Sequence, residues 1–322
     1  MLEINHLYRQ QNQSLSACED NQVDLAGRSK LSLFKAKTDS IEIEKEKSSV
    51  ADLLLILKET VYFCVRESND IICWEIYAVE SEIQQFLQQK IRGSDFDFLL
   101  WPIGDFAPPK LLVFDMDSTF IQIEVIDELA RQHGVGESVS KVTEAAMRGE
   151  LDFSESLISR VACLKGLEQS IIAKIANNLP LSIGVEQLVK CCHQNNTKVA
   201  IVSGGFTPFV QFLKTKMGLY EVKANNLEIM DGALSGKVQG DIVDAQSKAD
   251  FVNHLKSQLN IDANEIITIG DGANDLLMMK ESGFNLAYRA KPAVQEQAFG
   301  RMNQTNLGDL VTIFDWPEIN TK

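Results

Sequence analysis

The sequence predicts an α/β protein built on a doubly wound parallel sheet. A small helical bundle is inserted after the first strand of this sheet, and a further α/β region precedes it. Two patterns lead to this fold class: strands and helices alternate through the second half of the 322-residue chain, and four helical segments in a row follow the apolar strand KLLVFD. Hydrophobic residues make up 45% and charged residues 24%, as is usual for a globular protein with a sizeable core.

The first part of the chain, residues 1–105, is predicted to form the N-terminal α/β region. Residues 1 to about 50 are polar and weakly patterned, and the charge run IEIEKEKSS is expected to be a solvated linker or helix face. Beyond it, ADLLLILKE and SEIQQFLQQKI have amphipathic helical spacing, whereas VYFCVR and IICWEIYAV have the composition of strands. Pro108 and Pro109 mark a boundary, so the main domain is placed at residues 106–322.

The main domain begins with KLLVFD, which is apolar without alternation, as expected for a parallel strand buried on both faces. Helical patterns separated by glycine or polar breaks follow it. We expect them to form a helical cap over about residues 125–183, from the segments VIDELARQHG, SVSKVTEAAMRG, DFSESLISRVACLKG and LEQSIIAKIANN.

After Pro180, strands and helices alternate again. The predicted strands are KVAIVS, EIITIGD and FNLAYR, and the predicted helices are FTPFVQFLKTKMG, DAQSKADFVNHLKSQL and ANDLLMMKESG. Between them, LEIMDGALSGKV is typical of a hairpin that turns at Asp231 and Gly232. Ligands of such sheets bind beyond the carboxyl ends of the strands, so functional residues are expected there.

The charge of the chain restricts its partners. The formal net charge of −14 argues against nucleic acid and anionic membranes, because both attract basic surfaces. The start MLEINHLYRQQNQ has no apolar run of the signal-peptide type, and no apolar stretch approaches the length of a membrane span. The six cysteines form no CxxC pair and are expected to be free thiols. We therefore expect a cytoplasmic protein, and the sequence leaves its oligomeric state open.

Polar residues stand at the ends of three predicted strands. KLLVF ends in Asp115, KVAIV ends in the run 203–205 (Ser-Gly-Gly), and IITIG ends in Asp271. If these strands are parallel neighbours, all three groups lie at one edge of the sheet. Lys248 follows the hairpin at the start of a helix and could join them.

Acidic residues would converge at this edge: Asp115, Asp117, Asp271 and Asp275. Packed carboxylates repel one another and become protonated unless a cation lies among them. All-oxygen ligands suit Mg²⁺, which could also bind a phosphate oxygen. The hydroxyl of Ser203 and the glycine-flanked backbone after it can donate hydrogen bonds to phosphate, and Lys248 adds positive charge. The pattern therefore indicates phosphate chemistry.

Each of these signals also has an ordinary structural explanation. A DxD at a strand end is common, SGG is usually a turn, GDGAND could be a glycine-rich loop, and a single lysine on a helix normally faces solvent. Their joint occurrence, in this order and at strand ends, is much harder to explain by packing.

Together the motifs resemble those of the haloacid dehalogenase superfamily of phosphatases: DMDST (115–119), SGG (203–205), Lys248 and GDGAND (270–275). The chain is further similar to the phosphoserine phosphatase family over about residues 111–292, through DMDSTFIQIEVIDELA, AAMRGELDFSESLISRV, IVSGGFTPF, NNLEIMDGALSGKV, DIVDAQSKA and IGDGANDLLMM. The resemblance implies a HAD-like Rossmannoid sheet with a helical cap. It does not cover residues 1 to about 100, which could serve amino-acid sensing, oligomerisation or neither.

The resemblance implies a division of labour in the site. Asp115 is expected to be the nucleophile, and Asp117 is expected to protonate the leaving oxygen and then to activate water. Mg²⁺ would be held by Asp115, the backbone carbonyl of Asp117 and Asp271, and Asp275 would orient these ligands. The other motif residues are expected to contact the phosphate or the site: Ser203, Gly204, Lys248 and Asn274.

Two cap residues match family positions that bind the amino and carboxyl groups of the substrate. Glu124 would pair with the ammonium group, and the guanidinium of Arg160 with the carboxylate. From the residues alone, Glu124 could instead be an acid favoured at a helix start, and Arg160 a surface ion-pair residue. Met147 and Phe153 are expected to supply apolar walls, although Phe153 could equally be core.

The resemblance implies hydrolysis of the small-molecule substrate O-phospho-L-serine to serine and phosphate, the last step of serine biosynthesis. Two alternatives stay open. The phosphoryl group could pass to another alcohol, such as homoserine, through the same intermediate. A regulatory binding protein could also keep this fold, but the loss of the nucleophile would mark it, and Asp115 is present.

Overall fold

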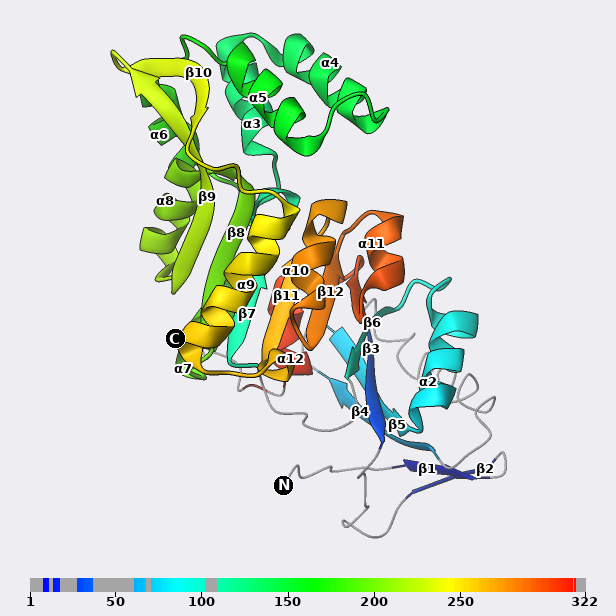
Figure 1. Ribbon diagram of the computed structural model, residues 1–322. Helices are drawn as coiled ribbons and strands as arrows, with labels where there is room; N and C mark the ends of the chain where they lie inside the picture. Colours follow the sequence, from blue (N-terminus) through cyan, green and yellow to red (C-terminus); the bar gives the residue numbers. More distant parts are fainter. Residues whose placement is uncertain are drawn as a thin grey trace.

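The computed structural model describes residues 8–11, 14–17, 28–36, 61–67, 71–101, 109–314 and 316. Within these residues the strands form one sheet, in the order β10-β9-β8-β7-β11-β12-β13-β6-β3-β5-β4-β1-β2. Figure 1 shows the helices α3 to α5 above the carboxyl ends of the central strands, with the N-terminal strands at the opposite end of the molecule.

The central part of the sheet consists of β7 (Leu111–Phe114), β8 (Lys198–Phe206), β9 (Glu221–Met230), β10 (Ala233–Gln239), β11 (Ile266–Gly270), β12 (Phe284–Tyr288) and β13 (Gly300–Met302). Its strands are parallel from β9 to β13, and β10 pairs antiparallel with β9. The strand β7 lies between β8 and β11. The predicted parallel sheet is therefore confirmed, and the motif-bearing ends of β7, β8 and β11 meet at one edge.

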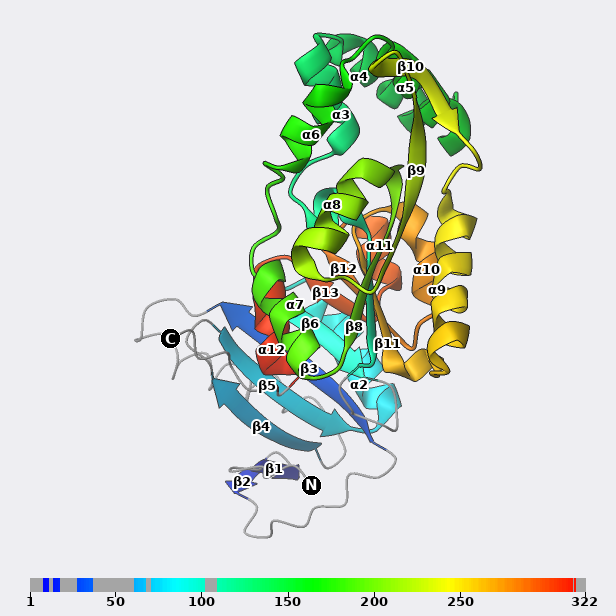
Figure 2. The ribbon, with the colours of Figure 1, turned by 90° about the vertical axis from the view of Figure 1, so that its left-hand side faces the viewer.

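Helices cover both faces of this part of the sheet (Figure 2). One face carries α7 (Val185–Gln194), α8 (Thr207–Met217) and α12 (Leu310–Ile313), and the other carries α9 (Ala245–Leu259), α10 (Leu276–Lys280) and α11 (Pro292–Gln297). Side chains of β7 alternate between the two cores: Leu112 and Phe114 pack on the α7 and α8 side, and Leu111 and Val113 pack with α9. Burial on both faces explains why this strand is apolar throughout.

The predicted cap helices follow β7 as α3 (Val125–His133), α4 (Gly136–Met147), α5 (Phe153–Cys163) and α6 (Gln169–Ala176). The cap is joined to the β9–β10 hairpin by the backbone bonds Gly166 N to Leu234 O and Leu234 N to Leu167 O, both 2.8 Å. The hairpin turns at Asp231 and Gly232, whose φ angles of 51° and 80° are those of the predicted tight turn. Among the described residues, no helix is long and apolar enough to cross a membrane.

The N-terminal strands extend the same sheet. They are β1 (Tyr8–Gln11), β2 (Ser14–Ala17), β3 (Ser29–Ala36), β4 (Val61–Glu67), β5 (Ile71–Ala78) and β6 (Asp97–Trp101). The strands predicted from VYFCVR and IICWEIYAV are β4 and β5. The helix predicted from SEIQQFLQQKI is α2 (Glu80–Phe86), which continues as a wider turn over Leu87–Ile91. The predicted helix ADLLLILKE and the charge run IEIEKEKSS lie outside the described residues.

The weak patterning of residues 1–50 does not foresee β3, which is an interior strand between β5 and β6. Its polar side chains are buried because both of its faces are covered. Lys30, which is 5% exposed, forms an ion pair with the fully buried Glu75 of β5. A strand that pairs its charges across the sheet in this way lacks the apolar run that would reveal it.

The N-terminal strands join the central sheet where β6 pairs antiparallel with β13. The buried side chain of Arg301 on β13 donates hydrogen bonds to carbonyl oxygens of Arg92 and Phe96, ahead of β6. The buried Asp97 carboxylate accepts the backbone N–H groups of residues 303–305. The Asp97 carboxylate and the terminal guanidinium nitrogens of Arg301 thus find partners across this junction, and no local pattern in the sequence signals that pairing.

Candidate active site

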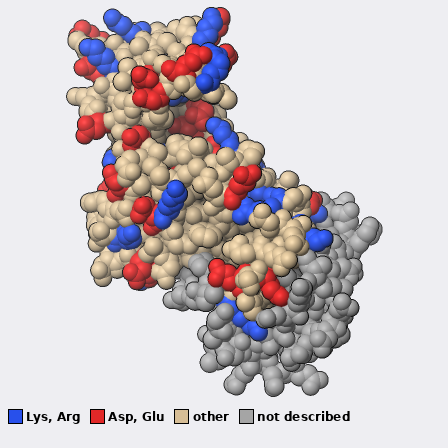
Figure 3. All heavy atoms as spheres, turned by 45° about the vertical axis from the view of Figure 1, so that its right-hand side comes forward, with Lys and Arg blue, Asp and Glu red and all other residues tan. Residues whose placement is uncertain are grey.

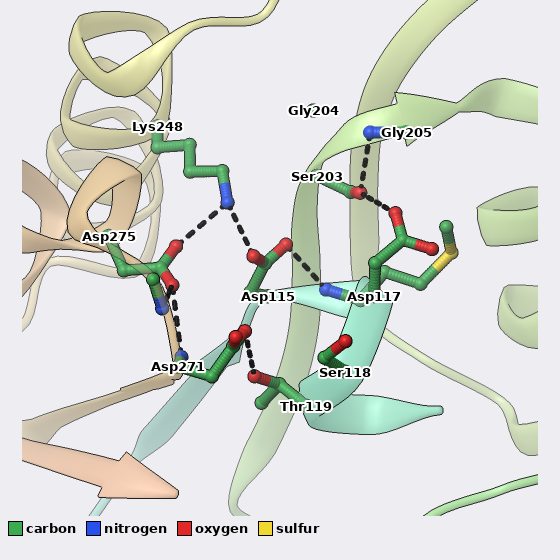
Figure 4. A network of polar contacts seen from close by, with 12 residues as sticks. Asp115, Asp117, Ser118, Thr119, Ser203, Gly204, Gly205, Lys248, Asp271 and Asp275 are labelled. Carbon is green, nitrogen blue, oxygen red and sulfur yellow. Dashed lines mark hydrogen bonds and ion pairs between the residues drawn. The ribbon is translucent and has the colours of Figure 1, made fainter. Parts of the chain in front are cut away.

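Asp115 stands directly after β7 (Figure 4) and lines the pocket between the sheet and the cap. Its backbone N–H donates to the carbonyl oxygen of Ile269 on β11 at 2.9 Å, which anchors it to the neighbouring strand. One carboxylate oxygen accepts the N–H of Met116 at 2.7 Å, and the other lies 2.8 Å from Nζ of Lys248. The side chain is thereby held in one orientation.

Lys248 lies on α9 with its ammonium group between two carboxylates. Its Nζ is 2.8 Å from both Asp115 Oδ2 and Asp275 Oδ1, and the residue is 1% exposed. Burial alone would lower the pKa of this lysine, but Asp115 and Asp275 raise it, so the group stays charged. The solvent-facing alternative for this lysine is therefore wrong.

The acids at this edge form a compact cluster: one oxygen each of Asp115, Asp271 and Asp275 lies within 4.8 Å of the others. Burial, with Asp275 close by, raises the pKa of Asp115 well above its ordinary value and that of Asp271 to about 6. One lysine does not compensate the charge of two buried carboxylates and a half-buried one, and a hard cation among their oxygens would. The donor set therefore fits a metal ion of the kind that prefers oxygen ligands.

Asp275 is used differently from the other two acids. One of its oxygens accepts the backbone N–H groups of Asp271 and Gly272 at 3.1 and 3.0 Å, and the other faces Lys248. Asp271 itself accepts a hydrogen bond from Thr119 Oγ1 at 3.1 Å. The Asp275 carboxylate thus shapes the loop that presents Asp271.

The side chain of Asp117 turns away from the acid cluster, toward the end of β8 (Figure 4). One carboxylate oxygen accepts the N–H of Val125 at 2.9 Å, and the other lies 3.4 Å from the hydroxyl of Ser203. Burial and the nearby charge of Glu124 raise the pKa of Asp117 to about 8. Two aspartates that are close in sequence thus occupy different environments, and Asp117 can carry a proton at neutral pH.

The Ser-Gly-Gly run at the end of β8 fits closely between Asp117 and the cap. Ser203 Oγ accepts the N–H of Gly205 at 2.8 Å. A Cβ on Gly204 would lie 2.9 Å from the ring of Phe153, and one on Gly205 would lie 2.5 Å from Asp117 Oδ2. The glycines are therefore required by the close approach of the cap and of the Asp117 carboxylate.

Asp115, Asp117 and Asp271 line a pocket of about 590 Å³ between the cap and the sheet. Figure 3 shows acidic side chains gathered in the recess below the cap helices. All the predicted substrate-contacting cap residues line this pocket, together with a residue of the fourth motif: Glu124, Met147, Phe153, Arg160 and Asn274. Met147 is 80% exposed, whereas Phe153 packs over Gly204, so the two predicted wall residues differ in their surroundings.

The predicted charge pair of the cap is directed into the pocket. Arg160 is half-buried, and burial lowers its pKa while Asp127 and Glu124 act in the opposite direction. Glu124 is the N-cap residue of α3, yet its carboxylate makes no capping hydrogen bond and instead accepts one from Ser118 Oγ at 2.7 Å. Glu124 therefore stands at a helix start, as the alternative has it, but its carboxylate is bound to Ser118 and lines the pocket.

Sequence reasoning gave no role to three other residues near the pocket. Asp127 and Lys291 line it, and Lys291 is held there by a 3.0 Å hydrogen bond from its N–H to the carbonyl oxygen of Asp271. Ser118 belongs to the DMDST motif and contacts Glu124. Helical spacing could have indicated Asp127, three residues after Glu124 on the same helix, whereas nothing in the sequence around Lys291 points to the site.

Comparisons with known proteins agree with this arrangement. The family model described as haloacid dehalogenase-like hydrolase matches residues 109–283. Phosphoserine phosphatase of Vibrio cholerae is 41% identical over 241 residues, which is 74% of each chain, and that of Haemophilus influenzae is 48% identical over 213 residues, which is 65% of this chain and 68% of the other.

Solved structures give the same result. The unliganded probable phosphoserine phosphatase from Vibrio cholerae superposes with a TM-score of 0.73 and 35% identity, covering 91% of this chain and 88% of that one. A substrate-bound phosphoserine phosphatase complex has a TM-score of 0.60 and 36% identity over 64% of this chain and 98% of that one. The chain therefore belongs to the haloacid dehalogenase-like hydrolases and, within them, to the phosphoserine phosphatase family.

Proposed function

We propose that this protein hydrolyses O-phospho-L-serine to serine and phosphate through an aspartyl phosphate on Asp115. One observation carries the proposal: a single pocket has Asp115 and Asp117 at its base and the opposite charges of Glu124 and Arg160 on its cap side. An amino-acid phosphate has a phosphate at one end and an ammonium and a carboxylate at the other, so it matches this distribution of charge.

The proposed reaction has two steps. A carboxylate oxygen of Asp115 attacks phosphorus while the bond from phosphorus to the serine oxygen breaks, and Asp117 gives its proton to that oxygen. In the second step, Asp117 takes a proton from water as the water oxygen attacks phosphorus, which releases phosphate and regenerates Asp115. The raised pKa of Asp117 supports its role as the acid in the first step.

The remaining motif residues would bind the phosphate and the substrate. Ser203 and the Gly204 backbone would donate hydrogen bonds to phosphate oxygens, and Lys248 would offset their charge. Asn274 would contact the bound group from the loop after β11. Met147 and Phe153 would form apolar walls that exclude water.

Mg²⁺ is the metal that we propose for the oxygen cluster. Asp115, the backbone carbonyl of Asp117 and Asp271 would hold it, and Asp275 would orient the loop of Asp271 through its two backbone contacts. When bound, the ion would offset negative charge on the phosphoryl group.

The stabilisation that Mg²⁺ gives to the protein should increase with pH. The pKa values of Asp271 and Asp117 are raised from 3.8 to about 6 and about 8. A carboxyl group whose pKa is higher in the folded protein than in the unfolded one stabilises the fold while it is protonated. This stabilisation is fully present below the unfolded-state pKa and is lost as the pH rises through the folded-state pKa. The metal-free protein therefore loses the Asp271 part of this contribution between about pH 4 and pH 6, and the ionised oxygens of Asp271 are then available to Mg²⁺.

Thermal unfolding with Mg²⁺ or with a chelator, at about pH 5.5 and about pH 8, would measure this effect. The increase in Tm from Mg²⁺ should be larger at the higher pH and absent in Asp271→Asn. An increase that is equal at both pH values, or larger at the lower one, would contradict the assignment.

We also propose a place and an organisation for the enzyme. The reaction would be the last step of serine biosynthesis, in the cytoplasm. Residues 106–322 would form the phosphatase domain, with its cap at about 125–183, and residues 1–105 would form an N-terminal α/β region of the same sheet. The protein as a whole would bind neither nucleic acid nor membrane. The proposal for the cap boundary is supported by the positions of α3 to α6.

Transfer of the phosphoryl group to an alcohol such as homoserine would use the same residues. A phosphate-release screen over phosphorylated metabolites, with and without added alcohols, would test the proposed hydrolysis. We expect O-phospho-L-serine to be the best substrate and free phosphate to form without an acceptor. Release of serine that requires homoserine and yields O-phosphohomoserine in place of free phosphate, or a strong preference for a substrate without an amino group, would overturn the proposal.

A further inference from the structure

We propose that Ser118 is a positioning residue whose hydroxyl holds the Glu124 carboxylate in the orientation that receives the ammonium group of the substrate. The inference rests on the proposed function and extends it to a residue of the DMDST motif that has no part in the two chemical steps. It concerns discrimination between amino-acid phosphates and other phosphate esters.

The loop after the nucleophile is tied to the start of the cap at three points. Asp117 Oδ1 accepts the N–H of Val125 at 2.9 Å, and the N–H of Ser118 donates to the carbonyl oxygen of Ile123 at 3.3 Å. The third bond joins side chains, from Ser118 Oγ to Glu124 Oε1 at 2.7 Å. The backbone bonds fix where residue 124 enters the pocket, and the hydroxyl fixes where its carboxylate points.

Glu124 would otherwise be free to turn. It is exposed, it lines the pocket, and it makes no capping hydrogen bond to its own helix although it occupies the N-cap position of α3. A glutamate side chain that is free to turn loses rotational freedom when a ligand binds to it, and this loss weakens binding. The bond from Ser118 uses only one of its two carboxylate oxygens, so the other remains available to an ammonium group.

The backbone of Ser118 shows why this residue is unusual. Its φ and ψ of 55° and 0° lie near the left-handed region, which is unfavourable for residues other than glycine. Glycine would adopt this conformation without strain but would lose the hydroxyl. Ser118 thus keeps a strained backbone and places its hydroxyl 2.7 Å from the carboxylate of Glu124, which faces the pocket. We infer that the position requires the serine side chain rather than an unstrained backbone.

Two substitutions separate the hydroxyl from the backbone. Ser118→Gly removes the hydroxyl and relieves the strain, and Ser118→Ala removes the hydroxyl and keeps the strain. A matched control is Ser140→Ala on α4, where a hydroxyl also faces a glutamate, with Ser140 Oγ 3.5 Å from Glu144 Oε1, but outside the pocket. If the alanine variant fails to fold, the glycine variant still tests the proposal.

The experiment measures kcat and KM of the full-length protein for O-phospho-L-serine and for p-nitrophenyl phosphate, which has no ammonium group. Both Ser118 variants should lose about tenfold in kcat/KM for phosphoserine, mainly through KM, because a hydrogen bond to a charged group is lost. Their kcat/KM for p-nitrophenyl phosphate and all constants of the Ser140→Ala protein should match the wild type.

Two outcomes would overturn the role of Ser118 alone. One is an unchanged kcat/KM for phosphoserine in the glycine variant. The other is an equal loss of kcat/KM on both esters, which would mark a merely structural role. If the wild-type protein has no preference for phosphoserine over p-nitrophenyl phosphate, the proposed function fails and the role of Ser118 fails with it. The wild-type arm therefore distinguishes the two failures.

Discussion

Asp115→Asn should abolish the release of phosphate from O-phospho-L-serine, lowering kcat by on the order of 10⁴-fold or more. An amide nitrogen or oxygen at this position cannot form the acyl phosphate that the proposed route requires. The fold should persist, because the substitution replaces a buried carboxylate of raised pKa by a neutral group of the same shape. Phosphate release measured beside thermal unfolding tests both parts of this expectation.

Asp231→Asn is the matched control for the change from aspartate to asparagine. Asp231 is exposed in the turn of the β9–β10 hairpin at a φ of 51°, a conformation that asparagine tolerates. This variant should keep full activity. Near-normal turnover in Asp115→Asn would show that another residue, or water, attacks phosphorus.

Lys248→Met should remove activity and also destabilise the fold. The ammonium group lies 2.8 Å from two buried carboxylates, and its loss leaves Asp115 and Asp275 facing each other without a compensating charge. Breaking a buried ion pair in this way costs about 3 to 5 kcal/mol in the free energy of unfolding. Denaturant unfolding and phosphate release should therefore both change, which separates this residue from Asp115, where only activity is expected to fall.

Lys280→Met provides the comparison, because Lys280 is exposed at the end of α10, the helix that follows Asp275. We expect its stability to lie within about 0.5 kcal/mol of the wild type. A Lys248→Met protein as stable as the control would mean that the buried carboxylates are protonated or otherwise compensated, and would contradict the view that the lysine holds the cluster together.

Much of the site was predictable because its residues sit at strand ends. The strand β7 is too apolar to be anything but buried, and its neighbours β8 and β11 end in residues of matching chemistry, so parallel topology brings Asp115, Ser203 and Asp271 together. Lys248 depends on the fold more strongly. A lysine on a helix looks solvent-facing in the sequence, and only the packing of α9 against the sheet places it between two carboxylates.

Other features were not predictable because they depend on contacts distant in sequence. The interior strand β3 carries the buried Lys30, whose ion-pair partner Glu75 lies on another strand. The sequence of β3 therefore lacks the continuous apolar run that would indicate a buried strand. The junction of β6 with β13 relies on Arg301 and on backbone carbonyls some 200 residues away along the chain. The orientation of Glu124 depends on the unusual backbone of Ser118, which no local preference of serine favours.

The most direct test of the account is to locate the phosphoryl group during turnover. The wild-type protein would be mixed with O-phospho-L-serine and Mg²⁺, quenched in acid within the first turnover, digested and examined by mass spectrometry. We expect one phosphoryl group on the peptide that contains Asp115, labile to hydroxylamine as an acyl phosphate is, and no modification in Asp115→Asn. A phosphoryl group on any other residue, or rapid turnover without a covalent intermediate, would contradict the central claim that Asp115 is the nucleophile.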